Sequence, residues 1–232
     1  MSQFGYVVAL DLHDQVAVLV GGGREAVARF EALQAAGAIV TVITPAPSSR
    51  LVDLVVAAGA RARLLRRDWQ PGDLADARIA IATREDPRTD VAGLWAESRE
   101  RHVTTSVLDD LDHTDFAQPA LVRRGDLRIA ISTGGSAPAL ARRYREELER
   151  LLGPAHGDVV AAAATAREVV GPRPVGFDEW AARWSTAVED VHGLAALVRE
   201  QGREAVIDRI VTALLTPDRA EAEPRTRQEA AA

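Results

Sequence analysis

Short apolar segments alternate with amphipathic segments along the first half of the chain. Five segments of strand length are rich in β-branched and aliphatic residues, at 16–20, 39–43, 61–65, 78–83 and 103–108. Several of them are apolar almost throughout, which is typical of strands covered on both faces. Between them, apolar residues recur at helical spacing over 24–36, 48–58 and 90–101. This alternation predicts a parallel sheet with right-handed crossovers, so we expect an α/β domain over residues 1–113.

The pattern changes in the second half of the chain. Residues 127–132 predict one more strand, and a turn at 133–136 leads into a strongly amphipathic helix over 138–152. Ser136 lies near the expected N-cap, and Pro138 falls in the first turn of the helix. Two further helical stretches follow. The last residues of the chain are rich in Pro, Glu, Arg and Ala and have no aromatic residues, which predicts a disordered tail. The expected parts are a dimerisation and substrate segment at 114–152, a helical domain at 153–215 and a tail at 216–232.

The two later helical stretches cover 158–169 and 178–214. We expect the second to be broken near Gly193 or Gly202, because glycine disfavours the interior of a helix. Trp180 and Trp184 are expected to lie in the core of this helical domain.

Composition narrows the classes of function. The 232 residues are 47% hydrophobic and carry a net charge of −6, which is typical of a globular protein and argues against a nucleic-acid partner. Cysteine is absent, which excludes disulfides, thiolate metal sites and cysteine nucleophiles. The sequence has no apolar run of 18 residues and no leader pattern, so we expect no membrane partner and a cytoplasmic location. All 28 basic residues are arginine, which excludes Schiff-base lysine chemistry.

A glycine turn directly follows the first predicted strand. Gly21-Gly22-Gly23-Arg24-Glu25-Ala26 fits the dinucleotide-binding pattern G-x-G-x-x-A between a strand and a helix. The glycines permit a tight turn and a close approach of the backbone to a pyrophosphate, which would lie at the N-terminus of the helix. A purely structural glycine turn is the alternative.

The second half of the dinucleotide pattern is missing. No acidic residue follows the second strand in Thr41–Ser48, Asp53 comes too late, and no arginine precedes Arg50. We therefore expect NAD rather than NADP, with ribose contacts from Thr44 or backbone groups. That Thr44 and Pro45 merely end a strand is an equally good interpretation.

The order of the motifs resembles precorrin-2 dehydrogenase, the N-terminal module of siroheme synthase. The resemblance covers about residues 6–152 and depends on the segments 6–12, 18–23, 35–42, 80–83, 116–125 and 131–142. The last, Ile131-Ser-Thr-Gly-Gly-Ser-Ala-Pro-Ala-Leu-Ala-Arg142, is the most specific. The resemblance implies NAD-dependent oxidation of precorrin-2 to sirohydrochlorin, on the way to sirohaem or cobalamin, by a homodimer with a Rossmann-type domain. Some members of the family also insert Fe²⁺.

The resemblance also implies a catalytic aspartate seven residues before Phe116, which is Asp109. Active sites of open parallel sheets lie beyond the carboxyl ends of the strands, and an ionised aspartate there can accept a proton as hydride leaves. From the residues alone, the acidic run Asp109–Asp115 is equally typical of a solvated turn. His113 within that run suggests a metal ligand only weakly, and we expect no metal site.

Three positions depart from the family pattern. Arg84 replaces an aspartate, the asparagine expected near Thr89 is absent, and Ser106 replaces a second asparagine. These departures motivate an alternative function, a regulatory module that senses NAD(H) without catalysis.

Recognition of a polycarboxylate tetrapyrrole requires cations and N–H donors. Residues 115–150 hold seven arginines against five acidic residues, although the whole chain is acidic. For Arg143, Arg145 and Arg150, the alternative is ion pairing on the helix surface. The residues expected to bind the cofactor are Gly21, Gly22, Gly23, Arg24, Glu25, Ala26, Thr44, Pro45 and Thr83. Those expected to bind the substrate are Arg123, Arg124, Thr133, Gly134, Gly135, Ser136 and Arg142.

Overall fold

The computed structural model describes residues 4–87, 89–172 and 175–216. The chain divides into two compact units, Met1–Gln118 and Pro119–Ala232. Apart from Thr216, the predicted tail lies outside the described residues. Within the described ranges, none of the helices combines the length and the apolar character that crossing a membrane requires.

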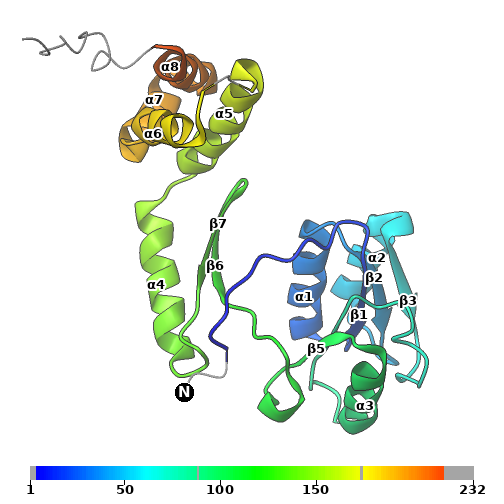
Figure 1. Ribbon diagram of the computed structural model, residues 1–232. Helices are drawn as coiled ribbons and strands as arrows, with labels where there is room; N and C mark the ends of the chain where they lie inside the picture. Colours follow the sequence, from blue (N-terminus) through cyan, green and yellow to red (C-terminus); the bar gives the residue numbers. More distant parts are fainter. Residues whose placement is uncertain (1–3, 88, 173–174, 217–232) are drawn as a thin grey trace, which may run out of the picture. The chain divides into compact units, whose positions relative to one another are not determined.

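The first unit contains a five-stranded sheet in which every neighbouring pair is parallel (Figure 1). Its order is β3-β2-β1-β4-β5. Strands β2 and β3 therefore lie on one side of β1, and β4 and β5 lie on the other. The strands are β1 (Val16–Val20), β2 (Ile39–Ile43), β3 (Ala62–Leu65), β4 (Ile79–Ala82) and β5 (Thr104–Val107). All five lie within the predicted segments, and the prediction of a parallel Rossmann-type sheet is confirmed.

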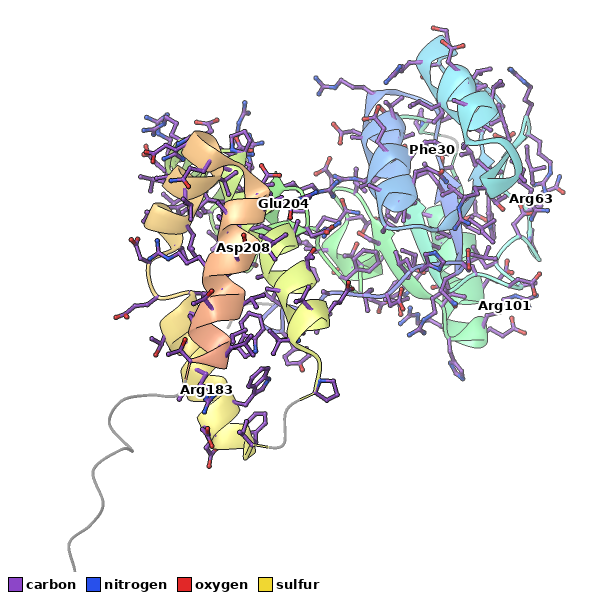
Figure 2. The ribbon with its side chains drawn as sticks, turned by 90° about the horizontal axis from the view of Figure 1, so that it is seen from above. Phe30, Arg63, Arg101, Arg183, Glu204 and Asp208 are labelled. Atoms are coloured by element: carbon purple, nitrogen blue, oxygen red, sulfur yellow. The ribbon has the colours of Figure 1, made fainter. Side chains whose placement is uncertain are left out.

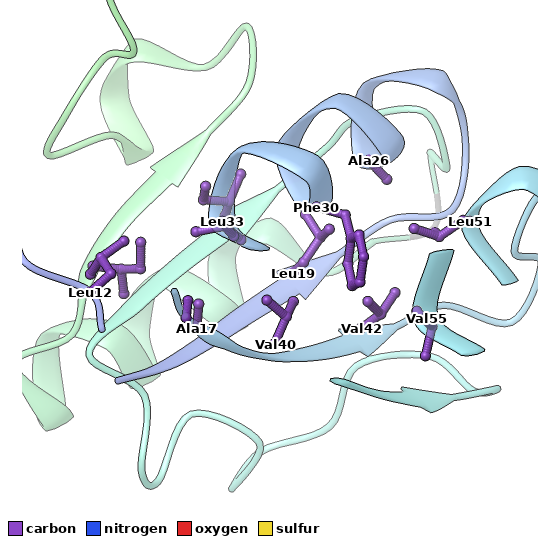
Figure 3. Close-up of a cluster of buried hydrophobic side chains, with 13 residues drawn as sticks. Leu12, Ala17, Leu19, Ala26, Phe30, Leu33, Val40, Val42, Leu51 and Val55 are labelled. Carbon is purple, nitrogen blue, oxygen red and sulfur yellow. The ribbon is translucent and has the colours of Figure 1, made fainter. Parts of the chain in front are cut away.

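Three helices cover the two faces of this sheet. They are α1 (Arg24–Ala35), α2 (Ser49–Ala58) and α3 (Val91–Arg101), with short 3₁₀ turns η1 (Gly59–Arg61) and η2 (Leu111–His113). Phe30 of α1 and Leu51 of α2 pack with Leu19 of β1 on one face (Figure 3). Val20 of β1 packs with Leu94 of α3 on the other. Because successive strand residues point to opposite faces, nearly every residue of β1, β2 and β4 is buried.

The second unit begins with a hairpin and a helix. Strands β6 (Ala120–Arg124) and β7 (Leu127–Ile131) pair antiparallel, and α4 (Pro138–Leu151) follows. The sequence analysis did not predict β6, although Gly125-Asp126 between two strand-like runs is a hairpin signal. Gly125 has a φ of 56°, which suits a glycine in this turn.

Four helices complete the second unit. They are α5 (Ala155–Val170), α6 (Phe177–Ala187), α7 (Val191–Gln201) and α8 (Arg203–Leu215). Their apolar faces meet in a core that includes Ala162, Leu194 and Ile210, while Glu204 and Asp208 project from α8 into solvent (Figure 2). Trp180 and Trp184, expected in the core, are half-buried and pack against it, with ring centroids 6.2 Å apart.

The long helical stretch is broken at two places. The break at Gly202 is confirmed, because Gly202 separates α7 from α8 with a φ of 87°. The break near Gly193 was placed wrongly: Gly193 lies inside α7, and the chain interrupts at 188–190. The reason is that the Asp190 side chain accepts a hydrogen bond from the Gly193 N–H and so begins the helix there.

Candidate active site

The glycine turn connects β1 to α1 at the carboxyl edge of the sheet. Gly21 has a φ of 140°, and a Cβ atom there would lie 2.0 Å from Thr83 Oγ1. A Cβ on Gly22 would lie 2.4 Å from the carbonyl oxygen of Ala46, and one on Gly23 would lie 2.5 Å from Glu85 Oε1. The backbone of Ala46 therefore leaves no room for a side chain at Gly22, and Thr83 crowds Gly21, whereas the contact at Gly23 is with the flexible end of the Glu85 side chain.

Neighbouring loops hold this turn in place. The Gly21 N–H donates to the carbonyl of Ile43 at 3.1 Å, and the Ser48 N–H donates to the carbonyl of Gly22 at 2.8 Å. Thr44 and Thr83 are buried beside the turn, and Pro45 follows Thr44. The predicted cofactor residues from three different strand ends are thus brought together.

The first turn of α1 contributes mainly through its backbone. The side chains of Arg24 and Glu25 form an ion pair of 3.6 Å in which Arg24 is 93% exposed. Ala26 is fully buried, which is the close packing of helix on strand that the motif predicts.

Glu85, which follows β4, was not predicted from the sequence. Its carboxylate accepts hydrogen bonds from the N–H groups of Gly23, at 3.0 Å, and Glu25, at 2.9 Å. We call these two donors the amide site. The buried Thr83 hydroxyl also donates to this carboxylate, at 3.2 Å.

Two opposing effects act on the Glu85 carboxyl. Burial raises its pKa, but hydrogen bonds from backbone N–H groups of α1 and from the Thr83 hydroxyl lower it by more. The pKa of Glu85 therefore lies below its ordinary value of 4.5. The amide site consequently stabilises a negative charge, as the N-terminus of a helix does.

A pocket of about 230 Å³ adjoins the glycine turn. Its lining combines the turn and the ends of β1 and β2 with two loops, and includes Gly21, Thr44, Pro45, Asp68, Trp69, Asp86 and Asp90. The lining has three carboxylates and no arginine among the described residues. Asp68 was overlooked because it follows β3, whereas the dinucleotide pattern directs the search to β2. The side-by-side pairing of β2 and β3 brings it to the same edge.

Asp109 lies in the loop after β5, at the same edge of the sheet. It is exposed, has a φ of 57°, and lines a pocket of about 150 Å³ together with Arg29, Ser106 and Gln118. A positive φ is uncommon for a residue other than glycine and is often found at functional sites.

The acidic run around Asp109 is more ordered than a solvated turn. The Thr114 hydroxyl accepts from the Val107 N–H at 3.0 Å, and the Asp115 carboxylate accepts from the Thr105 N–H at 2.8 Å. Asp115 also forms an ion pair with Arg99. These contacts fasten the end of the loop that follows η2 to β5.

Arg84 contacts the Asp109 loop from the end of β4. Its guanidinium donates to the carbonyl of Asp109 at 3.3 Å and lies 3.8 Å from the carboxylate of Asp110. His113 Nδ1 lies 2.9 Å from Asp110 Oδ1. This hydrogen bond from His113 outweighs the effect of burial and lowers the pKa of Asp110, and Arg84 lowers it further. The departure at Arg84 therefore places a cation beside the predicted base.

The predicted substrate residues lie in the second unit. Gly134 and Gly135 adopt φ values of 60° and 84° in the turn after β7. Ser136 was expected near the N-cap of α4 and directly precedes it, since Ala137 is the N-cap. No side chain caps this helix, and the Thr133 Oγ1 accepts from the Ala137 N–H at 3.2 Å. Arg123 is exposed on β6.

The arginines of this unit differ in their contacts. Arg124 donates to the carbonyls of Leu152, at 2.6 Å, Glu149, at 2.8 Å, and Arg123, at 2.8 Å, so it caps the carboxyl end of α4. The Arg124 guanidinium is therefore engaged by backbone carbonyls in this structure. Arg142 pairs with Glu146 at 3.3 Å. Ion pairs on the helix surface are confirmed for Arg143, Arg145 and Arg150.

Comparison with protein families divides the chain at nearly the same place as its two units. Residues 8–120 match a family described as putative NAD(P)-binding. Residues 124–151 match a family described as sirohaem biosynthesis protein central.

Curated relatives carry the same combination. The chain is 31% identical to siroheme synthase of Chromobacterium violaceum over 184 residues, which cover 79% of this chain and 38% of the relative. It is 32% identical to siroheme synthase of Methylococcus capsulatus over 207 residues, which cover 88% of this chain and 42% of the relative. The chain therefore spans less than half the length of these relatives.

A solved structure has the same fold. SirC, a precorrin-2 dehydrogenase, superposes with a TM-score of 0.62 at 21% sequence identity and covers 90% of this chain and 98% of that one.

Proposed function

We infer from this combination that the chain belongs to the precorrin-2 dehydrogenase family of sirohaem biosynthesis, and we propose that it oxidises precorrin-2 to sirohydrochlorin with NAD⁺ as the hydride acceptor. The proposal depends mainly on one observation. A single chain combines a dinucleotide unit that contains the glycine turn with the central segment of sirohaem biosynthesis proteins. The shared fold of a precorrin-2 dehydrogenase supports it.

The residues at the glycine turn fit a dinucleotide. The two N–H groups of the amide site already donate to an anionic carboxylate. The missing Cβ atoms at Gly21 and Gly23 leave room for closely approaching groups. In the proposed complex, Gly21–Gly23 and the start of α1 hold the pyrophosphate, and Thr44 and Pro45 line the adjoining pocket.

The charge of that pocket supports NAD over NADP. The carboxylate of Asp68 is suited to hydrogen-bond the ribose hydroxyls, which is the task of the acid that the sequence pattern lacks after β2. A 2′-phosphate would instead meet Asp68, Asp86 and Asp90 without an arginine from the described lining.

Asp109 is the proposed general base. A bound nicotinamide would supply the hydride acceptor, and the Asp109 carboxylate takes the proton that the substrate loses. Arg84 and Thr114 hold the loop in which Asp109 lies. The products are sirohydrochlorin, NADH and a proton.

The remaining assignments concern the substrate and the assembly. We propose that Arg123, Arg142 and the turn Thr133–Ser136 bind substrate carboxylates, since guanidinium groups and N–H donors recognise carboxylates well. We also propose a cytoplasmic homodimer, as the family resemblance implies. Insertion of Fe²⁺ into sirohydrochlorin is a further activity to be tested by supplying the metal and the product together.

The test is the absorbance change on mixing the protein with precorrin-2 and NAD⁺. We expect sirohydrochlorin to form, and Asp109→Asn to reduce turnover by about 100-fold or more while NAD⁺ binding is retained. Asp112→Asn, a change of the same charge in the exposed part of the loop, is the control.

Two results would contradict the proposal. Folded protein that forms no sirohydrochlorin beside an active reference enzyme would exclude the dehydrogenase. If that protein still binds NAD⁺, the alternative of a sensing module without catalysis is favoured.

A further inference from the structure

We propose that Glu85 is an internal competitor of the cofactor: its carboxylate occupies the amide site, and a dinucleotide must displace it to bind. This inference rests on the proposed use of the glycine turn for a dinucleotide, and it assigns a role in cofactor affinity to a residue outside the dinucleotide pattern.

The first step is the identity of the donors. In the dinucleotide pattern, the N–H groups at the start of the helix after the glycine turn bind the pyrophosphate. Here the N–H groups of Gly23 and Glu25 donate to the two carboxylate oxygens of Glu85. Glu85 lies 62 residues after Gly23 and 60 residues after Glu25.

The second step is the space. A Cβ atom on Gly23 would lie within 2.7 Å of both carboxylate oxygens of Glu85. The role of this glycine in the pattern is to let a phosphate approach the backbone. The carboxylate therefore fills the volume that the absent side chain leaves for a phosphate.

The third step is the charge. A carboxylate and a pyrophosphate are both anions, and two anions on the same pair of donors repel each other. The cofactor and the Glu85 carboxylate therefore exclude one another from the amide site.

The fourth step is that Glu85 can leave. It is an exposed residue in the loop after β4, and the hydrogen bonds described above hold only its carboxylate. When the carboxylate leaves, the Thr83 hydroxyl beside Gly21 loses this acceptor and becomes available to the ligand. The measured affinity is then the intrinsic affinity reduced by the fraction of molecules in which Glu85 has moved away.

The experiment measures NAD⁺ binding by calorimetry and the melting temperature of the ligand-free protein. Glu85→Gln removes the charge at nearly constant size, and Glu85→Asp keeps the charge on a shorter chain. Glu31→Gln is the matched control, because it makes the same change on an exposed residue of α1, away from the amide site.

We expect Glu85→Gln to bind NAD⁺ about tenfold more tightly and to melt at a lower temperature, since the ligand-free helix loses a charged hydrogen-bond acceptor. We expect Glu85→Asp to bind more tightly than the parent by a smaller factor, and Glu31→Gln to change neither quantity. Adenosine, which has no phosphate, should bind equally to the parent and to Glu85→Gln.

Equal or weaker NAD⁺ binding by Glu85→Gln would overturn the inference, as would an equal gain for adenosine. A failure of the proposed function has a different signature. If no variant binds NAD⁺ but inorganic pyrophosphate binds more tightly to Glu85→Gln than to the parent, the role of Glu85 stands and the dinucleotide assignment falls.

Discussion

Single charged side chains shape the loops at the carboxyl edge of the sheet. Arg67 donates to both oxygens of Asp73, at 2.7 Å and 2.6 Å, and to the carbonyl of Asp68 at 3.0 Å. Asp73 also accepts from the Gln70 N–H at 2.9 Å. This network folds the loop that carries Asp68 and Trp69 to the cofactor pocket, just as Thr114 and Asp115 fold the loop that carries Asp109.

The Arg67–Asp73 pair predicts a dependence of stability on pH. The hydrogen bond from Arg67 outweighs burial and lowers the pKa of Asp73 below its ordinary value of 3.8. A lowered pKa in the folded state means that the carboxylate stabilises the fold above pH 3.8, and that this contribution is lost as the pH falls through the folded-state pKa.

We expect Asp73→Asn to cost about 1–3 kcal/mol of stability at neutral pH, because a charged and largely buried hydrogen-bond network loses its acceptor. The difference from the parent should shrink below pH 3.8. Urea unfolding at neutral and acidic pH measures it, with Asp126→Asn, which is 81% exposed, as the control. A difference that does not change with pH would contradict this explanation.

At the scale of elements, side-chain acceptors cap the helices α1, α2, α3 and α7 in two ways. Ser48, Asp90 and Asp190 cap α2, α3 and α7 with their own side chains, each accepting an N–H three residues later. In contrast, α1 begins at Gly23, which has no side chain, and receives the carboxylate of Glu85 from another loop. A local cap stays with its helix, whereas a distant one can be exchanged for a ligand.

The local cap of α7 gives the prediction at this scale. Asp190→Ala should lower the free energy of unfolding by about 1 kcal/mol, because the Gly193 N–H loses its acceptor, and Asp190→Ser should restore most of it. Thermal unfolding measures the change, and Asp208→Ala on the exposed face of α8 is the control. Equal stability of Asp190→Ala and the parent would show that the cap contributes nothing.

At the scale of the whole molecule, charge and chemistry divide between the two units. The glycine turn, the acidic pocket and Asp109 belong to the first unit, and the arginines of the central segment belong to the second. The net charge of −6 hides this division, since residues 115–150 carry more arginines than acidic residues. A long-range attraction of a polycarboxylate to that segment is the expected consequence.

Binding of sirohydrochlorin, the proposed product, tests this attraction without turnover. We expect the double variant Arg123→Glu and Arg142→Glu to bind it about tenfold more weakly at low salt, with a smaller difference at high salt, because ions screen exposed charges. Absorbance titration measures the affinity. Arg209→Glu, exposed on α8, is the control, and an equal loss there would indicate a general effect of net charge.

The amino-acid sequence by itself determined the elements and their order. The five strands of the sheet, the three helices between them and the glycine turn follow from the spacing of apolar residues and from residues within one turn of each other. The resemblance added Asp109, whose place after β5 in an ordered loop agrees with that expectation. The strand β6 was not predicted because its arginines interrupt the apolar pattern.

Only the tertiary structure decided which residues distant in the sequence meet in space. Glu85 meets Gly23 across 62 residues, Asp68 reaches the pocket through the pairing of β3 with β2, and Arg124 meets Leu152 across 28 residues. The physical reason is that periodicity records contacts between near neighbours, whereas these contacts depend on how strands and loops pack in space. The sequence therefore identified a turn that can bind an anion, and the structure revealed that the chain supplies an anion of its own.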